Sequence, residues 1–193
     1  MDRIFSKPNQ LKSFSKKDDG YAADYTTQTN GRKKVVLSNI RPKDINSFQL
    51  INEGEIEFWG VNFEKCKANL GTENEICECL FVAKQMNAKK WACFIELKYC
   101  LDKERNNKKN SNKAYSQLKS SMITLLEKGI LNKKDFKIFL NVSLPNSLNV
   151  PFVNFITNPD KIATARDDGY TLYGYNKLRI FNESILLPVK EII

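Results

Sequence analysis

Two short apolar runs, ICECLFVA at residues 76–83 and WACFIELKYC at residues 91–100, decide the fold of this chain. Both runs are rich in the β-branched and aromatic residues that strands favour. The connection between them, KQMNAKK at residues 84–90, is polar. Two apolar strands joined by a short polar connection predict an antiparallel hairpin.

Three charged residues interrupt this apolar hairpin. Glu78 lies inside the first run, and Glu96 and Lys98 lie inside the second. Because side chains alternate along a strand, Glu96 and Lys98 share one face of their strand. Burying such groups costs several kcal/mol unless they are paired or bind a metal. The three residues are therefore candidates for a catalytic or metal-binding site.

The chemistry that suits these residues is hydrolysis of phosphodiesters. Two carboxylates on neighbouring strands are able to share a hard divalent cation, Mg²⁺ or alternatively Mn²⁺. Such a cation lowers the pKa of a bound water, and a lysine beside it orients the water and offsets negative charge in the transition state. A Glu-x-Lys in a strand is also a common exposed pair. An unrelated α/β binding protein with such a pair therefore stays open as an interpretation.

The composition narrows the possible chemistry. The chain has 31 Lys and Arg against 22 Asp and Glu, a net charge of +9. This surplus favours phosphate-rich partners, although many lysine-rich proteins bind no nucleic acid. The chain contains no histidine, which excludes Ser-His-Asp and Cys-His nucleophiles and histidine metal sites. An enzyme with this sequence must use carboxylates, lysines, hydroxyls or a metal.

The apolar patterning predicts a cytoplasmic protein with reduced cysteines and no membrane segment. No run reaches the roughly 18 apolar residues of a membrane helix, and the charged N-terminus lacks the apolar stretch of a secretory signal. A single Cys-x-Cys without a second matching pair gives little support for zinc. We expect buried thiols that act as small apolar groups. The cysteines are Cys66, Cys77, Cys79, Cys93 and Cys100.

The N-terminal part of the chain is less clearly patterned. Residues 1–34 are polar and rich in Lys, Thr and Asn, which predicts an arm or loosely packed extension. Residues 35–193 are then a single domain. Within that domain, residues 35–52 indicate a short strand followed by a short helix that opens near Pro42-Lys43-Asp44.

The remaining patterns complete an α/β core. Residues 55–63 and 136–144 alternate apolar and polar side chains and predict strands. Residues 113–128 predict the clearest helix, which Gly129 is placed to stop. At least one added strand is expected in residues 150–193. The order from residue 55 is strand, strand, strand, helix, strand, which predicts a mixed sheet.

On these residues the chain resembles the PD-(D/E)XK nuclease superfamily, which has the restriction-endonuclease-like fold. The resemblance is carried by Glu78, by FIELK at residues 94–98 and by the helix that begins KAYSQL at residues 113–118. It implies an α/β fold with a restriction-endonuclease-like core: a mixed central sheet in the order αβββαβ, flanked by helices, with C-terminal strands added.

The resemblance also implies roles for individual residues. Glu78 and Glu96 would bind the metal, and Lys98 would activate water. A polar residue of the following helix often reaches the site in this superfamily; by position it is Gln117 here, with Lys113 as the second choice. The implied catalytic set is Glu78, Glu96, Lys98 and Gln117.

The sequence departs from the superfamily pattern before the hairpin. The first acid is Glu78 rather than the usual Asp, and no proline precedes it. The first core helix, which often supplies another acid, is weakly marked. Glu53, Glu55 and Glu64 all stay open as that acid.

The implied partner is nucleic acid, with DNA expected ahead of RNA. A basic loop at residues 101–113 follows the second strand and is placed to contact phosphates, unless it is simply a solvated loop. Its basic residues are Lys103, Arg105, Lys108, Lys109 and Lys113. A second basic cluster on the expected arm comprises Lys16, Lys17, Arg32, Lys33 and Lys34.

The resemblance places the chain among restriction, defence or mobile-element nucleases and implies a possible homodimer, because such enzymes often pair to cut two strands. The alternative is a non-catalytic subunit of the same fold that binds nucleic acid or serves in assembly. The change from Asp to Glu at the first acid would suit that alternative.

Overall fold

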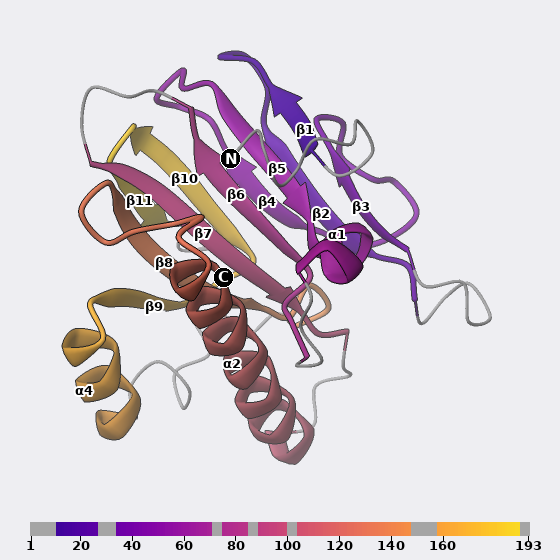
Figure 1. The fold of residues 1–193 in the computed structure, drawn as a ribbon. Helices are drawn as coiled ribbons and strands as arrows, with labels where there is room; N and C mark the ends of the chain where they lie inside the picture. The colour runs from indigo at the N-terminus through magenta and orange to yellow at the C-terminus, as the bar shows by residue number, and fades with distance from the viewer. Residues whose placement is uncertain are drawn as a thin grey trace.

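The hairpin formed by the two apolar runs lies inside a six-stranded sheet (Figure 1). The structure is a computed structural model that describes residues 11–26, 34–70, 75–84, 89–99, 104–147 and 158–189. The first four strands of the sheet are antiparallel neighbours, and the last three run parallel to one another. In spatial order the strands are β1 (Leu11–Phe14), β5 (Phe58–Asn62), β6 (Cys79–Ala83), β7 (Lys90–Leu97), β8 (Phe136–Ser143) and β9 (Tyr170–Gly174).

A second sheet of five strands packs against one face of the first. It is mixed as well, because β10 and β4 are parallel while its other neighbours are antiparallel. Its strands in spatial order are β11 (Ile185–Pro188), β10 (Lys177–Asn182), β4 (Phe48–Ile51), β2 (Gly20–Asp24) and β3 (Val35–Ser38). The strands expected after residue 150 are therefore confirmed as β9, β10 and β11.

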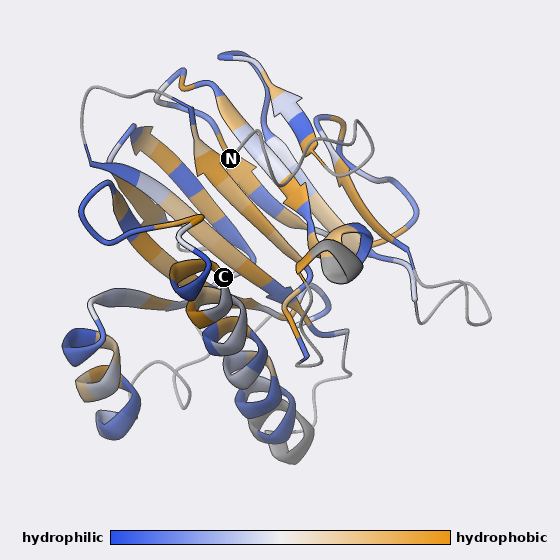
Figure 2. Ribbon diagram, viewed as in Figure 1, coloured by the Kyte–Doolittle hydropathy of each residue, from blue (hydrophilic) through white to orange (hydrophobic). Residues whose placement is uncertain are grey.

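In the described residues, three helices cover the other face of the six-stranded sheet. They are α1 (Phe63–Leu70), α2 (Glu104–Glu127) and α4 (Pro159–Asp167). All three contribute to one apolar core with that face, while a second core fills the space between the two sheets. Figure 2 shows the central strands mostly apolar and much of α2 and α4 hydrophilic, as expected of helices with one face toward solvent. The chain is thus α/β with two mixed sheets.

Strand β7 is buried on both faces, and its alternation connects the two cores. Ile95 belongs to the core between the sheets, whereas Phe94 belongs to the core under the helices. The sequence of a strand that is buried on both sides is a nearly continuous apolar run. This explains why residues 91–100 give such a clear strand signal, and the predicted antiparallel hairpin is confirmed by the pairing of β6 with β7.

The expected N-terminal arm is wrong for residues 11–26. These residues form β1 and β2, and every residue of β2 is buried. The sequence of β2, GYAAD, contains mostly small residues, and its first residue passes close to two large rings. A Cβ on Gly20 would come within 3.1 Å of the Phe58 ring and 3.2 Å of the Phe81 ring. Small residues give little hydrophobic periodicity, so the sequence pattern did not predict this core strand.

The helix expected near Pro42-Lys43-Asp44 does not form. The strand before it is confirmed as β3, but residues 41–47 are irregular and lead directly into β4. Phe48 and Leu50 are fully buried against the first sheet and alternate with partly exposed neighbours. That period of two is the mark of a strand with one buried face.

The long helix is confirmed, but it starts earlier than expected. Helix α2 begins at Glu104 rather than at Lys113, so the described part of the expected basic loop is helical. Its first turns, ERNNKKNSN, contain no apolar residue and therefore give no periodic signal. The predicted stop is confirmed, since Gly129 has a φ of 65° and donates to the Leu126 carbonyl at 3.0 Å.

The expected order of helix, three strands, helix, strand is met only in part. Strands β5, β6 and β7 are followed by α2 and β8 in that order, but α1 lies between β5 and β6. In the described residues before β5, the chain forms strands instead of a helix. These strands build the second sheet and the edge of the first.

The described cysteines fit their expected role, since Cys66, Cys77, Cys79 and Cys93 are all buried and reduced. Cys100 lies outside the described residues. In the part of the chain that the structure describes, none of the helices has the length and apolar character needed to cross a membrane.

Candidate active site

Glu78 and Glu96 face each other across the open end of the hairpin. Cys79 pairs with Ile95 in the antiparallel register, so the next position sets Glu78 opposite Glu96. The backbone N–H of Glu78 donates to Oε2 of Glu96 at 3.0 Å. The carbonyl of Glu78 accepts from the N–H of Phe63, at the start of α1, at 3.1 Å. Glu96 lies on the sheet face that the helices cover, because it alternates with Phe94 along β7.

Lys98 completes this arrangement from the same strand. Its ammonium donates to Oε1 of Glu96. Its backbone N–H donates to the Ser143 carbonyl at 2.9 Å, which extends the ladder between β7 and β8 past the end of β7. The Glu96 side chain is 0% exposed and that of Lys98 is 20% exposed. The interpretation of an exposed surface pair is thus wrong for Glu96.

The two glutamates lie in a poorly solvated place, which disfavours their charged forms. Burial raises the pKa of Glu96 above its usual value, while the neighbouring Lys98 opposes that rise. Burial likewise raises the pKa of Glu78, and the charges of Glu96 and Asp24 raise it further. One lysine thus faces several carboxylates, so a bound cation would relieve the imbalance.

Asp24 is a member of this acid cluster that sequence reasoning missed. It ends β2 of the second sheet, is 9% exposed, and accepts from the N–H of Thr26 at 2.8 Å through Oδ1. Its charge raises the pKa of both Glu78 and Glu96. The sequence does show an acid at the end of a run of mostly small residues. Because residues 1–34 were expected to form an arm, Asp24 was not considered as a site residue.

Tyr99 ties the second sheet to this end of β7. Its hydroxyl accepts from the N–H of Asp24 at 3.3 Å and donates to the Asn46 carbonyl at 2.7 Å. Burial raises the pKa of Tyr99 well above its usual value. The phenol therefore stays protonated and holds Asp24 beside the hairpin.

Of the three upstream acids left open, Glu64 is the one whose charge reaches Glu78. It stands in the first turn of α1, accepts from the N–H of Val35 at 2.9 Å, and its charge raises the pKa of Glu78. Glu53 instead pairs with Arg179 at 3.3 Å, and Glu55 is exposed in a turn with a φ of 49°. Glu64 differs from Glu53 and Glu55 only in belonging to α1, and the sequence pattern does not give the position of that helix.

Helix α2 brings Gln117 next to the segment that carries Glu78. Ser121 accepts from the N–H of Cys77 at 2.7 Å and donates to the Gln117 carbonyl at 2.8 Å. One turn before Gln117, Lys113 pairs with Glu75 at 3.2 Å. Gln117 lies on the same helix face between these contacts. Its Oε1 is buried and accepts no hydrogen bond from the described residues.

The basic residues expected to contact phosphates are distributed along the start of α2. Lys109 and Lys113 are exposed there, and Lys113 is engaged with Glu75. Arg105 and Lys108 belong to the same helix, but their side chains lie outside the described part. Lys103 also lies outside the described residues.

Within the described ranges, no three or more His, Cys, Asp or Glu side chains converge closely enough to hold a metal ion. The candidate ligands are therefore the two opposed carboxylates of Glu78 and Glu96. The chain matches no protein-family model, no curated protein and no solved structure in comparisons with known proteins.

Proposed function

We propose that this chain is a divalent-metal-dependent nuclease with a core like that of the PD-(D/E)XK superfamily. The observation that carries the proposal is that Glu78 stands opposite Glu96 at the open end of the hairpin, with the Glu78 N–H and the Lys98 ammonium both on the Glu96 carboxylate. These are the three residues that the resemblance assigns to metal binding and water activation. The order β5, β6, β7, α2, β8 supports the same core.

The donor set fits magnesium better than a metal that needs a complete protein cage. Mg²⁺ is usually held by one or two carboxylates and keeps several waters or substrate phosphates as its other ligands. Two opposed carboxylates without a third are therefore sufficient. The excess of negative charge around Glu78, which has no hydrogen bond to its carboxylate from the described residues, also supports a cation there.

Each residue of the site has a distinct role in this proposal. Glu78 and Glu96 hold the metal, which when bound polarises the phosphoryl oxygen and acidifies a water. Lys98 orients the attacking water and offsets the negative charge that develops on the phosphate. Gln117 has a buried, unpartnered oxygen one turn from Ser121, and that oxygen is available to position a water. Glu64 is the further acid from a helix.

The substrate we propose is nucleic acid, DNA ahead of RNA. The net charge of +9 supports attraction of a polyanion. Such attraction is independent of base sequence, so it provides affinity and leaves sequence preference to other contacts.

A cleavage assay tests the site directly. Plasmid DNA, single-stranded DNA and RNA are incubated with the protein in magnesium, manganese or EDTA. We expect metal-dependent cleavage of DNA that Glu96→Gln or Lys98→Ala reduces by about two to four orders of magnitude. Each change removes a group that acts only near the reacting phosphate.

Two matched variants control for general effects of the substitutions. Glu57→Gln changes an exposed acid, and Lys90→Ala changes the lysine at the opposite end of β7. Both should cleave like the unmodified protein. Cleavage that survives Glu96→Gln and Lys98→Ala would place the activity elsewhere.

A non-catalytic subunit that binds nucleic acid is the second candidate function. The observation in its favour is that the described acids do not form a three-ligand metal group. It predicts salt-sensitive binding of DNA with no cleavage in magnesium or manganese, so the same assay separates the two functions.

A further inference from the structure

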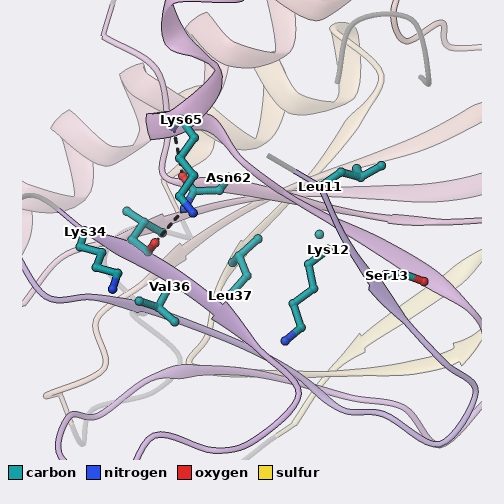
Figure 3. A pocket seen from close by; sticks show the side chains of 10 residues that line it. Leu11, Lys12, Ser13, Lys34, Val36, Leu37, Asn62 and Lys65 are labelled. Atoms are coloured by element: carbon teal, nitrogen blue, oxygen red, sulfur yellow. Dashed lines mark hydrogen bonds between the residues drawn. The ribbon is translucent and has the colours of Figure 1, made fainter. Parts of the chain in front are cut away.

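A concave site lies next to Glu64, one of the acids whose charge affects Glu78. A cavity of about 440 Å³ opens between β1, β3 and β5, beside the start of α1 (Figure 3). This volume is within the usual range for ligand pockets. Its lining residues are Leu11, Lys12, Ser13, Lys34, Val35, Val36, Leu37, Gly60, Asn62 and Lys65.

The charged residues that line this cavity are all lysines. Lys12, Lys34 and Lys65 come from three separate segments, and none of the ten lining residues is an acid. Lys12 donates to Oδ1 of Asn39 at 3.2 Å, and its charge lowers the pKa of Asp18, which accepts from the same asparagine. The exposed side chain of Lys34 makes no hydrogen bond or ion pair within the described residues. Such a pocket favours an anion.

Val35 connects the cavity to the acid cluster. It lines the cavity, its N–H donates to Glu64 at 2.9 Å, and its carbonyl accepts from Nδ2 of Asn62 at 2.8 Å. Glu64 in turn lies close enough to Glu78 to raise its pKa. The lysine-lined cavity and the acid cluster are therefore linked through Val35 and Glu64.

We propose that this lysine pocket binds a backbone phosphate of the nucleic-acid strand whose neighbouring phosphodiester lies at Glu78 and Glu96. The proposal rests on the proposed function and names how the substrate is held. Phosphate contacts fix the position of a strand without reading its bases. The acid cluster repels a polyanion, so a lysine pocket beside it supplies attraction where the strand must approach.

Binding of a fluorescent DNA duplex of about 20 base pairs, measured in EDTA across roughly 50–200 mM salt, tests this proposal without cleavage. In Lys12→Ala/Lys34→Ala we expect about tenfold weaker binding at low salt, and a salt slope smaller by about one for each lysine. Lys34→Ala alone, at an exposed position, should give half of the change in slope and keeps the test valid if the double variant is unstable.

A matched control removes the same charge elsewhere. Lys133→Ala/Lys134→Ala changes two exposed lysines just before β8, at the end of the sheet opposite Lys98. We expect its affinity and salt slope to equal those of the unmodified protein. Pocket variants that bind DNA like this control would overturn the proposal.

The outcomes separate the pocket from the nuclease site. Metal-dependent cleavage lost in Glu96→Gln, together with pocket variants that bind like the control, overturns the pocket alone. Loss of binding in the pocket variants without any cleavage by the unmodified protein supports the phosphate pocket and overturns the nuclease.

Discussion

The two faces of strand β7 differ sharply although both are buried. Ile95 and Glu96 are adjacent in sequence, and each is 0% exposed. The face toward the second sheet is apolar along its length, through Ile95 to Leu97. The face toward α2 is apolar only as far as Phe94 and then becomes charged at Glu96. Burial alone therefore does not tell a structural residue from a functional one.

The difference lies in how each face meets the cost of burial. The apolar face gains free energy from every side chain removed from water. At the charged end, the charge of Asp24 raises the pKa of Glu78 and Glu96, while Lys98 lowers both and the Glu78 N–H lowers that of Glu96. A buried charge without full compensation opposes folding. The hairpin is thus stabilised along most of its length and destabilised at the end that carries the site.

The prediction with the largest expected effect compares one substitution on each face of β7. Ile95→Ala leaves a cavity between the sheets and should lower the free energy of unfolding by about 2–5 kcal/mol. Glu96→Gln keeps a carbonyl acceptor for the Glu78 N–H and leaves Lys98 able to reach water, so it should stay within about 1 kcal/mol of the unmodified protein. Urea unfolding in EDTA measures both. Equal losses would make Glu96 a structural anchor.

Magnesium should stabilise the charged end alone. A ligand present at about 100 times its dissociation constant raises the free energy of unfolding by about 2.7 kcal/mol. We expect such a rise in the unmodified protein and in Ile95→Ala, and none in Glu96→Gln. Thermal unfolding in magnesium chloride, against sodium chloride of equal ionic strength, detects it. A rise that persists in Glu96→Gln would assign the metal to other ligands.

The smallest expected effect is a dependence on pH. Because the folded pKa of Glu78 is raised, the folded state holds the proton more tightly, and stability falls as pH rises above the unfolded value of about 4.3. Glu78→Gln removes this loss. At neutral pH in EDTA it should add about 1 kcal/mol, or about 2–4 °C in Tm.

That gain should disappear as the pH approaches about 4, where Glu78 is protonated in both states. Glu57→Gln is the control, because Glu57 is exposed and its substitution should leave the pH profile unchanged. A gain for Glu78→Gln that is equal at all pH values would show that charge is not its cause.

The sequence was sufficient to predict the hairpin and its opposed acids, because both follow from an alternation of two. It was insufficient for β2, whose small residues fit beneath Phe58 and Phe81 and carry little apolar signal. Because that strand was not predicted, Asp24 was not recognised as a candidate site residue. The start of α2 was also missed, since its first turns are polar on every side.

Residues that reach the site from outside the hairpin depend on tertiary packing. Glu64 could not be told from Glu53 or Glu55 by pattern, because α1 is short and lies between β5 and β6. Gln117 was proposed from the resemblance, and its placement near Glu78 depends on how α2 packs on the sheet, where Ser121 accepts from the N–H of Cys77. Local residue spacing determines which face of a strand a side chain occupies. Which residues of different elements meet at one site depends on the packing of the whole chain.

The tie from Tyr99 to Asp24 has a consequence for the order of folding. It joins residues 75 positions apart, while the Cys77–Ser121 bond spans 44 and the Val35–Glu64 bond spans 29. Contacts between distant residues must first close long loops, so they form after local ones. We expect the Asp24 amide to gain protection from hydrogen exchange later than the β6–β7 hairpin during refolding. A newly made chain would then bury its core before it completes the candidate site.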